Sequence, residues 1–358
     1  MRTLECDRFV SYLETQGVTD FTLIGACAVT KDVEERVINS ISSSNNRIIV
    51  IGCISQRIRN AAEKAGAIHI LNTTTLEELF KNGADIFPNI QNIKPYFVIS
   101  NNTLCNRQYK SIKSYNRNLL QRIIQRNTII PFLVVARGCN NNCSYCHSRL
   151  FMGKLLSKNI DQILSEYNEL VNRSYPLINI IAGDVGSYGH DISSNLPYLL
   201  FNLEKHTPDQ NTKWMLDGLQ PRWFIKYKDD LLPYIIKKRL VAMSIPIQSG
   251  SNRILELMNR PPNIKESLEV LCDFRKYNKM LYLQGIFIVG FPGESIEDFK
   301  LSLDFILSVK FNEVTLIQYS EFDVCASRLI NPKVSSISVN DRINMAKGIL
   351  KENGIRVN

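Results

Sequence analysis

The feature that most constrains the fold is a regular alternation of strand and helix patterns that begins near residue 129. Six short apolar segments have the pattern of strands: Ile130–Val135, Leu177–Ala182, Lys213–Leu216, Leu240–Ile245, Leu281–Val289 and Glu313–Gln318. Helical periodicity fills the gaps between them, most clearly over Ile264–Tyr277 and Ser295–Leu307. Strict alternation of this kind is typical of a parallel sheet covered by helices. Six such units predict an open (β/α)6 barrel over residues 129–320, with its chemistry at the carboxyl ends of the strands.

Three cysteines follow the first of these strands on one short loop. Cys139, Cys143 and Cys146 have the spacing C-x3-C-x2-C. Three thiolates so close together can hold three irons of a [4Fe–4S] cube and leave the fourth iron open, as a substrate-activating cluster requires. Zinc fits less well, because structural zinc takes four ligands, commonly as two spaced pairs. The loop therefore predicts a catalytic iron–sulfur site.

Further polar and glycine-rich segments follow the later strands: Ala182–Asp191, Ile245–Asn252, Leu257–Arg260 and Ile288–Ser295. Each segment alone has the composition of a turn. In this order behind the three cysteines, they resemble the methylthiotransferase branch of the radical S-adenosylmethionine (SAM) enzymes, from about Asp20 to Tyr319. The resemblance implies an α/β protein with a small N-terminal parallel-sheet domain and a radical SAM partial (β/α)6 barrel.

The resemblance also implies SAM as a cofactor bound at the open iron. Tyr145 is expected beside the adenine, and Gly183 leaves a strand end open for contact with SAM. Asp184 is expected to pair with the methionine amino group, with an N-cap of a short helix as its alternative. For His190, a role as a helix cap and a role as a ligand both stay open. No role is assigned to His69 or His206.

Two later segments complete the expected SAM site. Gln248 and Ser249 can hydrogen-bond the ribose or the carboxylate. Gly290, Pro292 and Gly293 are expected to shape a rigid turn near the adenine.

Residues 1–88 have their own alternation of strands and helices and resemble the auxiliary-cluster domain of the family. Cys27 and Cys53 each follow a predicted strand, so both are expected at one edge of a small parallel sheet. The resemblance implies that they hold a second [4Fe–4S] cluster, with Cys6 as the third ligand; the alternative is a pair of small buried side chains. Cys6 fits the pattern least, because the opening strand of the family is missing before it.

Charge is distributed unevenly along the chain. No Asp or Glu occurs from Ile86 to Ile160, whereas eleven lysines and arginines do, although the whole chain has a net charge of only +9. This segment includes an expected basic linker, residues 89–128. It predicts either a positive surface for an anionic partner or a solvated basic helix.

The first functional hypothesis is a methylthiotransferase that acts on an unactivated C–H of a tRNA adenosine of the threonylcarbamoyl type, with flavodoxin or ferredoxin as electron donor. The second is the same radical chemistry on a peptide, a protein or a small molecule, since the chain stops at residue 358, after an expected C-terminal helical extension (321–358) and without the terminal β-barrel of the family. The third is a degenerate homologue with a single cluster. Cys105, Cys272 and Cys325 fit no ligand pattern. With nine cysteines and neither a signal peptide nor a membrane span in the sequence, a cytoplasmic location is expected.

Overall fold

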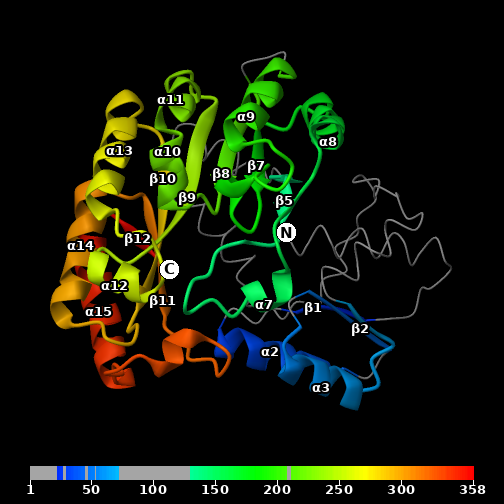
Figure 1. The fold of residues 1–358 in the computed structure, drawn as a ribbon, viewed down its shortest axis with the longest axis vertical. Helices are drawn as coiled ribbons and strands as arrows, with labels where there is room; N and C mark the ends of the chain where they lie inside the picture. Colours follow the sequence, from blue (N-terminus) through cyan, green and yellow to red (C-terminus); the bar gives the residue numbers. More distant parts are fainter. Residues whose placement is uncertain (1–21, 27–29, 45–46, 53, 72–129, 208–210) are drawn as a thin grey trace. The chain divides into compact units, whose positions relative to one another are not determined.

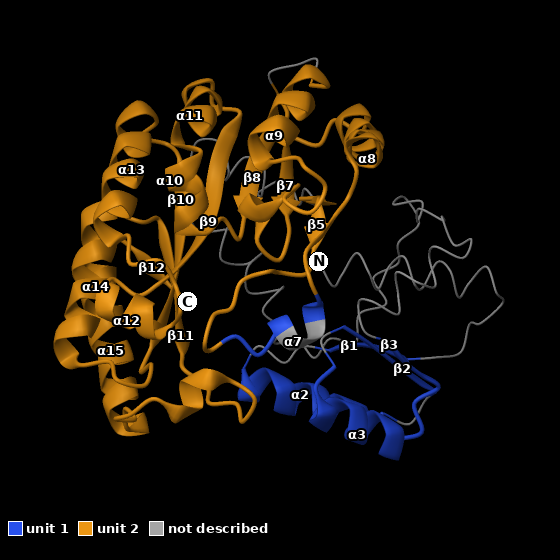
Figure 2. Ribbon diagram, in the orientation of Figure 1, with its two compact units in different colours: residues 1–110, 146–153 blue, residues 111–145, 154–358 orange. Residues whose placement is uncertain are grey.

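The computed structural model describes residues 22–26, 30–44, 47–52, 54–71, 130–207 and 211–358. The chain divides into two compact units (Figure 2), unit 1 with residues 1–110 and 146–153 and unit 2 with residues 111–145 and 154–358. The sequence pattern also predicts helices over Asp7–Gln16, Thr75–Phe80 and Asn116–Gln125, and these three segments lie outside the described residues. No helix in the described ranges is long and apolar enough to cross a membrane.

Unit 1 contains β1 (Thr22–Ala26), α2 (Lys31–Ser42), β2 (Ile48–Gly52), α3 (Gln56–Lys64), β3 (His69–Leu71) and α7 (Arg149–Met152). The three strands form a parallel sheet in the order β1-β2-β3, as the alternation predicted. Thr30 and Ser55 start the two longer helices, because their hydroxyls accept backbone N–H groups that lack a partner inside the helix. The buried Glu34 of α2 accepts from the hydroxyl of Ser55 and pairs with Arg57 at 2.8 Å, which ties α2 to α3.

Unit 2 holds a seven-stranded parallel sheet in the order β12-β11-β10-β9-β8-β7-β4. Its strands are β4 (Phe132–Val134), β7 (Leu177–Ile181), β8 (Lys213–Asp217), β9 (Leu240–Gln248), β10 (Tyr282–Val289), β11 (Glu313–Gln318) and β12 (Arg356–Val357). Since the strands follow each other across the sheet in chain order, all six predicted strands are confirmed as one partial barrel (Figure 1). Their carboxyl ends consequently lie along one edge.

Helices connect the strands of unit 2: α8 (Ile160–Asn172), η2 (Val185–Ser187), α9 (Leu196–Lys205), α10 (Pro221–Lys226), α11 (Lys228–Ile236), α12 (Asn252–Leu257), α13 (Ile264–Tyr277), α14 (Ile296–Val309), η3 (Ala326–Leu329) and α15 (Ser336–Glu352). Aromatic packing attaches them to the sheet. Phe287 of β10 lies 6.3 Å from Phe305 of α14 and 6.1 Å from Phe311, measured between ring centroids, and all three rings are buried. Burial of such large apolar groups contributes most of the stability of this layer.

The C-terminal segment differs from its sequence pattern, which indicated only a helix. After α15 the chain forms β12, which pairs in parallel with β11. Arg356 and Asn358 both donate to the buried carboxylate of Glu313, which also accepts from the hydroxyl of Tyr282 at 2.5 Å. A strand of two residues gives no periodic signal, and it exists here because it supplies donors to a carboxylate that is otherwise costly to bury.

Candidate active site

The loop that carries the cysteines is tied at its base. Strands β5 (Ala136–Arg137) and β6 (Leu156–Ser157) pair antiparallel across it. Within the loop, the amide oxygen of Asn140 accepts from the backbone N–H of Leu155 at 2.9 Å. These bonds hold both ends of the segment that carries the cysteines, and Cys139 follows β4 and β5 at the carboxyl edge of the sheet.

Asn141 joins the first cysteine to Asp184. Its Nδ2 lies 3.0 Å from Cys139 Sγ and 2.9 Å from Asp184 Oδ2, while its Oδ1 accepts from Arg222 at the start of α10. Arg222 also lies 3.1 Å from Asp184 Oδ2. Burial raises the pKa of the Cys139 thiol and the nearby Asp184 carboxylate adds to the effect, although both hydrogen bonds from Asn141 oppose it. A bound metal reverses this, because it takes the thiolate form.

Asp184 is fully buried and only one of its two oxygens is saturated. Oδ2 accepts from Asn141, Arg222 and Trp223 Nε1, the last at 2.9 Å. Oδ1 has no hydrogen-bond partner within the described residues. Asp184 stands before η2, yet its side chain makes no cap hydrogen bond, so the N-cap alternative has no support in its contacts. A free, buried carboxylate oxygen is suited to a cationic ligand.

Aromatic side chains enclose Asp184 on the other side. Trp223 stacks on Tyr227 with ring centroids 5.8 Å apart, and the ring of His190 meets its face edge-on at 4.7 Å. His190 Nε2 lies 3.2 Å from the hydroxyl of Tyr227. Burial, then Lys226 and Arg222, lower the pKa of His190. The contacts of His190 show neither of the two roles left open for it. Its ring packs against Trp223, which in turn donates to the Asp184 carboxylate.

The second cysteine faces a buried arginine. Arg260 NH1 lies 3.9 Å from Cys143 Sγ and 3.3 Å from the hydroxyl of Tyr145, and NH2 donates to Pro246 O at 2.7 Å. Tyr145 meets Phe291 edge-on at 6.4 Å between centroids. Cys146 follows three residues after Cys143, begins the segment grouped with unit 1 and is a half-buried cysteine without a disulfide bond among the described residues.

The Leu257–Arg260 motif, for which the sequence analysis predicts no specific role, holds the cysteine loop in place. Ser144 donates its backbone N–H to Met258 O at 3.0 Å and its hydroxyl to Leu257 O at 2.8 Å. Asn259 Nδ2 donates to Asn142 O at 2.7 Å. The motif thus fixes the backbone on both sides of the second cysteine, Cys143.

Gln248 and Ser249 are both expected to contact SAM, but they differ in whether their polar side-chain atoms already have hydrogen-bond partners. Gln248 ends β9 with a φ of 77°, a strained conformation for a residue other than glycine, and its buried Oε1 is without a hydrogen-bond partner in the described part of the chain. Strain of this kind is concentrated at functional sites. The hydroxyl of Ser249 is fully buried, accepts from Ser251 N at 3.1 Å and lies 3.5 Å from Ser302 Oγ. Its bonds are made within the protein.

The last predicted segment forms the expected turn. Glu294 N donates to Phe291 O at 2.9 Å, with Pro292 at the second position and Gly293 at the third, where φ is 84°. That pattern is typical of a type II turn. Gly290 also has a positive φ of 80°, and a Cβ there would come within 2.3 Å of Val339. Gly183 follows Ala182 directly after β7 and is half-buried.

The proposed ligands of the second cluster, Cys6, Cys27 and Cys53, lie outside the described residues, as does Cys105. The strands that precede two of them are described. Ala26 and Gly52, the last residues of β1 and β2, pair with each other, and Cys27 and Cys53 follow them directly in the sequence. Gly52 has a φ of 126°, and a Cβ there would lie 2.6 Å from Ala26 O, so the approach of the two strand ends requires glycine.

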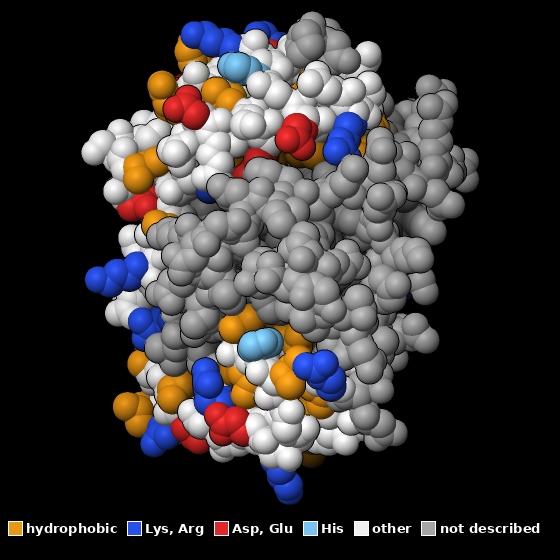
Figure 3. All heavy atoms as spheres, turned by 90° about the vertical axis from the view of Figure 1, so that its right-hand side faces the viewer, with side chains coloured by type: hydrophobic (Ala, Val, Ile, Leu, Met, Phe, Trp, Pro, Cys, Tyr) orange, Lys and Arg blue, Asp and Glu red, His pale blue; other side chains and the backbone are white. Residues whose placement is uncertain are grey.

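Four basic residues of the segment are described: Arg137, Arg149, Lys154 and Lys158, of which Lys154 is exposed. Arg137 is buried, and Lys158 pairs with Glu166 of α8 at 2.6 Å. On the face drawn in Figure 3, the visible lysines and arginines are scattered, with acidic side chains near several of them. The other seven basic residues before Arg137 lie outside the described ranges. A positive surface therefore stays a prediction.

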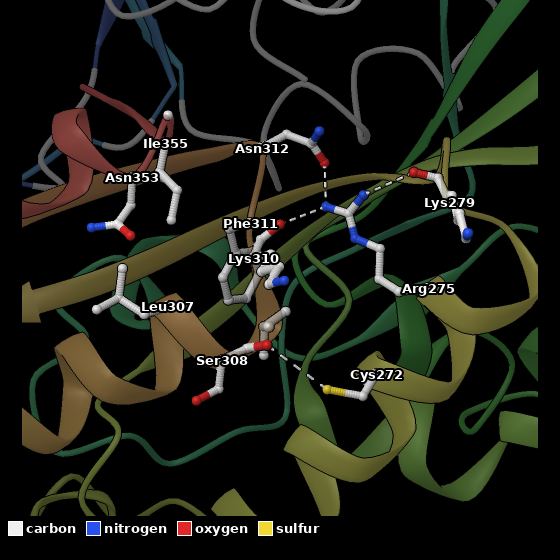
Figure 4. A pocket seen from close by; sticks show the side chains of 12 residues that line it. Cys272, Arg275, Lys279, Leu307, Ser308, Lys310, Phe311, Asn312, Asn353 and Ile355 are labelled. Atoms are coloured by element: carbon white, nitrogen blue, oxygen red, sulfur yellow. Dashed lines mark hydrogen bonds between the residues drawn. The ribbon is translucent and has the colours of Figure 1, made fainter.

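A pocket of about 760 Å³ lies at the opposite edge, where β11 and β12 begin (Figure 4). Arg275 spans it and donates to Lys310 O at 2.8 Å and Asn312 Oδ1 at 2.6 Å. The exposed Cys272 lies on its rim, whereas Cys325 is buried and donates to Tyr145 O at 3.5 Å. Because the cysteine loop and Asp184 follow the carboxyl ends of strands, this pocket is not the candidate active site.

The residues present fit a cluster held by three cysteines better than a single metal ion. Among the described residues, no three His, Cys, Asp or Glu side chains are arranged to hold one ion. A cube does not need that arrangement, because each cysteine binds a different iron. Two of the three thiols already face hydrogen-bond donors, Asn141 at Cys139 and Arg260 at Cys143, as the sulfurs of a bound cluster require.

Comparison with known proteins agrees with this geometry. Residues 133–306 match the radical SAM superfamily. The matched residues make up just under half of the chain, and their similarity to this superfamily supports an enzyme with the expected [4Fe–4S] cluster and SAM.

Within that superfamily, the resemblance to methylthiotransferases is confirmed. The chain is 28% identical to the ribosomal protein uS12 methylthiotransferase RimO of Clostridium kluyveri over 85% of its own length and 67% of the relative. It is 26% identical to the tRNA-2-methylthio-N(6)-dimethylallyladenosine synthase of Fervidobacterium nodosum (88% and 70%). It is 25% identical to the threonylcarbamoyladenosine tRNA methylthiotransferase MtaB of Thermotoga maritima (95% and 75%).

Among solved structures, the radical SAM methyltransferase TsrM from Kitasatospora setae, with tryptophan and a SAM analogue bound, is similar in fold. The TM-score is 0.55 at 10% identity, and the match covers 87% of this chain and 64% of TsrM. The chain thus spans less than two thirds of the length of that protein, and the likeness concerns the fold alone.

Proposed function

We propose that this chain is a methylthiotransferase that inserts sulfur and a methyl group at an unactivated C–H bond. The observation that carries the proposal is the bond chain Cys139–Asn141–Asp184, which links a cluster cysteine to a buried carboxylate with one free oxygen. Cys139, Cys143 and Cys146 would hold a [4Fe–4S] cluster. When bound and reduced, that cluster supplies the one-electron cleavage of SAM that generates a hydrogen-abstracting radical.

The side chains around the cluster would bind and orient SAM. Asp184 Oδ1 would accept from the methionine ammonium, and Trp223 and Arg222 hold the carboxylate in place. Gln248 Oε1 would accept from a ribose hydroxyl. Tyr145 would lie against the adenine, near the turn formed by Gly290, Pro292 and Gly293.

As substrate we propose tRNA, at an adenosine of the threonylcarbamoyl type. The tRNA-modifying relatives and the acid-free segment from Ile86 to Ile160 support this choice, since cations that contact phosphates bind nucleic acid. A protein substrate is the second candidate, because the RimO-type relatives match equally well. Flavodoxin or ferredoxin is the proposed electron donor, and a cytoplasmic location stays a prediction.

We further propose a second [4Fe–4S] cluster at Cys27 and Cys53, with Cys6 as the third ligand. The pairing of Ala26 with Gly52 supports it, because it brings the two cysteine-bearing strand ends to one edge.

The test is iron and sulfide content after anaerobic reconstitution, for the wild type and for the Cys139→Ala/Cys143→Ala/Cys146→Ala variant. About eight irons falling to about four would support two cubes, and about four falling to none would remove the second cluster. Cys272→Ala, at an exposed cysteine, is the matched control. The loaded enzyme is then given dithionite, SAM and either tRNA or ribosomal protein uS12, and the products are analysed by mass spectrometry. Methylthiolated adenosine supports the tRNA proposal, and modified protein alone overturns it.

A further inference from the structure

The three asparagines between Cys139 and Cys143 have different environments. Asn140 uses its amide to hold the backbone of Leu155, and Asn142 is exposed. Of the three, only Asn141 directs its side-chain amide at residues of the candidate active site. Its Nδ2 reaches both Cys139 Sγ and Asp184 Oδ2, and its Oδ1 accepts from Arg222. Because Arg222 fixes the orientation of the amide, its two N–H groups must face the sulfur and the carboxylate.

We propose that Asn141 is a positioning residue that couples the cluster to SAM binding by setting both the reduction potential of the cluster and the affinity for SAM. This inference rests on the proposed function, since it takes Cys139 as a cluster ligand and Asp184 as the partner of the SAM ammonium. Asn141 is not a catalytic residue, because it acts through these two side chains.

The sign of the effect on the potential follows from charge. Reduction adds an electron to the cluster and makes its cysteine sulfurs more negative, so an N–H donor at Cys139 stabilises the reduced form. Removing the donor shifts the potential to a more negative value. A carboxylate at the same position shifts it further, because it places a second negative charge beside the sulfur.

The effect on SAM follows from Asp184. Its Oδ2 accepts three donors, of which Asn141 is one, and they hold Oδ1 toward its ligand. One net hydrogen bond is worth about a factor of five in affinity. Asn141→Ala is therefore expected to weaken SAM binding about fivefold.

The experiment compares the reconstituted full chain with Asn141→Ala, Asn141→Asp and the matched control Asn142→Ala. Iron content, the midpoint potential from a reductive titration followed by electron paramagnetic resonance, and the SAM dissociation constant from equilibrium dialysis are measured for each. The expected order of potentials, from least to most negative, is wild type equal to Asn142→Ala, then Asn141→Ala, then Asn141→Asp. SAM affinity is expected to fall only in the two variants of Asn141.

Each other outcome overturns the inference. Wild-type potential and affinity in an iron-loaded Asn141 variant would mean that the contacts do not act on either property. Loss of iron from both variants would mean that Asn141 serves the folding of the loop. The proposed function fails separately, if the wild type itself binds no cluster at these cysteines or makes no methylthiolated product.

Discussion

Substitution of Gly186 by alanine tests whether the contact of η2 with α10 holds the site together. A Cβ at Gly186 would lie 2.2, 2.3 and 2.4 Å from Cγ, Cδ1 and Cβ of Trp223. Gly186 does not have a left-handed φ, so its backbone accepts alanine without strain. The substitution therefore isolates one effect, displacement of the indole ring from Asp184.

Two contributions set the magnitude. Overpacking in a core costs about 1–3 kcal/mol. Displacement of Trp223 also removes its 2.9 Å hydrogen bond to Asp184, and a bond to a charged group is worth about 1.5–3 kcal/mol. The free energy of unfolding should thus fall by about 2.5–6 kcal/mol. Gly348→Ala is the control: it has open space and sits in α15, so it should stabilise by about 0.5–1 kcal/mol.

Urea unfolding followed by tryptophan fluorescence measures both changes, because Trp214 and Trp223 are the two tryptophans of the chain and both lie in unit 2. In a Trp223→Ala background the same glycine substitution should cost less than about 1 kcal/mol, since the clashing ring is gone. The reasoning is refuted if Gly186→Ala changes stability by less than about 0.5 kcal/mol, or if its cost persists in the Trp223→Ala background.

Three further predictions follow from the site. Asp184→Asn should raise the SAM dissociation constant at least about tenfold in equilibrium dialysis, with iron content unchanged, because the ammonium loses its counter-charge; equal affinity would remove Asp184 from the SAM site. Ser249→Ala should lower the free energy of unfolding by about 1 kcal/mol and leave SAM affinity within about twofold, and a tenfold loss would mean that Ser249 contacts SAM. Although burial raises the pKa of Asp298, hydrogen bonds from Arg253 and Ser251 outweigh it and lower the pKa to about 2. The stability that Asp298 contributes is thus present above its ordinary pKa near 4 and lost as the pH falls toward 2, so wild type should lose about 1–2 kcal/mol more than Asp298→Asn in urea titrations between pH 5 and pH 2; parallel losses would contradict this.

The sequence predicted what local patterns encode. Buried parallel strands such as β9 are continuous apolar runs, and helix α13 has the apolar periodicity of a helix with one exposed face. The predicted ends of both elements therefore lie close to the observed ends. The cluster loop was found because three cysteines in eight residues have few structural explanations. The strand rule then brought Asp184 and Gln248 to the same edge as the loop.

The surrounding shell could not be found in this way. Asn141 meets Asp184 across 43 residues, Trp223 meets it across 39, and Arg260 meets Cys143 across 117. Asparagine, tryptophan and arginine have many ordinary uses, and only the fold shows which atoms they face. Gly186 carried a signal in retrospect, because a glycine outside a positive-φ turn often marks close approach of another group.

The bonding of Asp184 argues that this shell was built for a ligand. A carboxylate that served the fold alone would be expected to have both oxygens paired, because an unpaired buried acceptor costs about 1–3 kcal/mol. Here three donors converge on Oδ2 and, within the described residues, none reaches Oδ1. Arg222 and Trp223 hold the carboxylate through Oδ2 and leave Oδ1 without a hydrogen bond from either of them. A ligand that donates a hydrogen bond to Oδ1 would recover this cost, and the ammonium of SAM is the donor that we propose for this position.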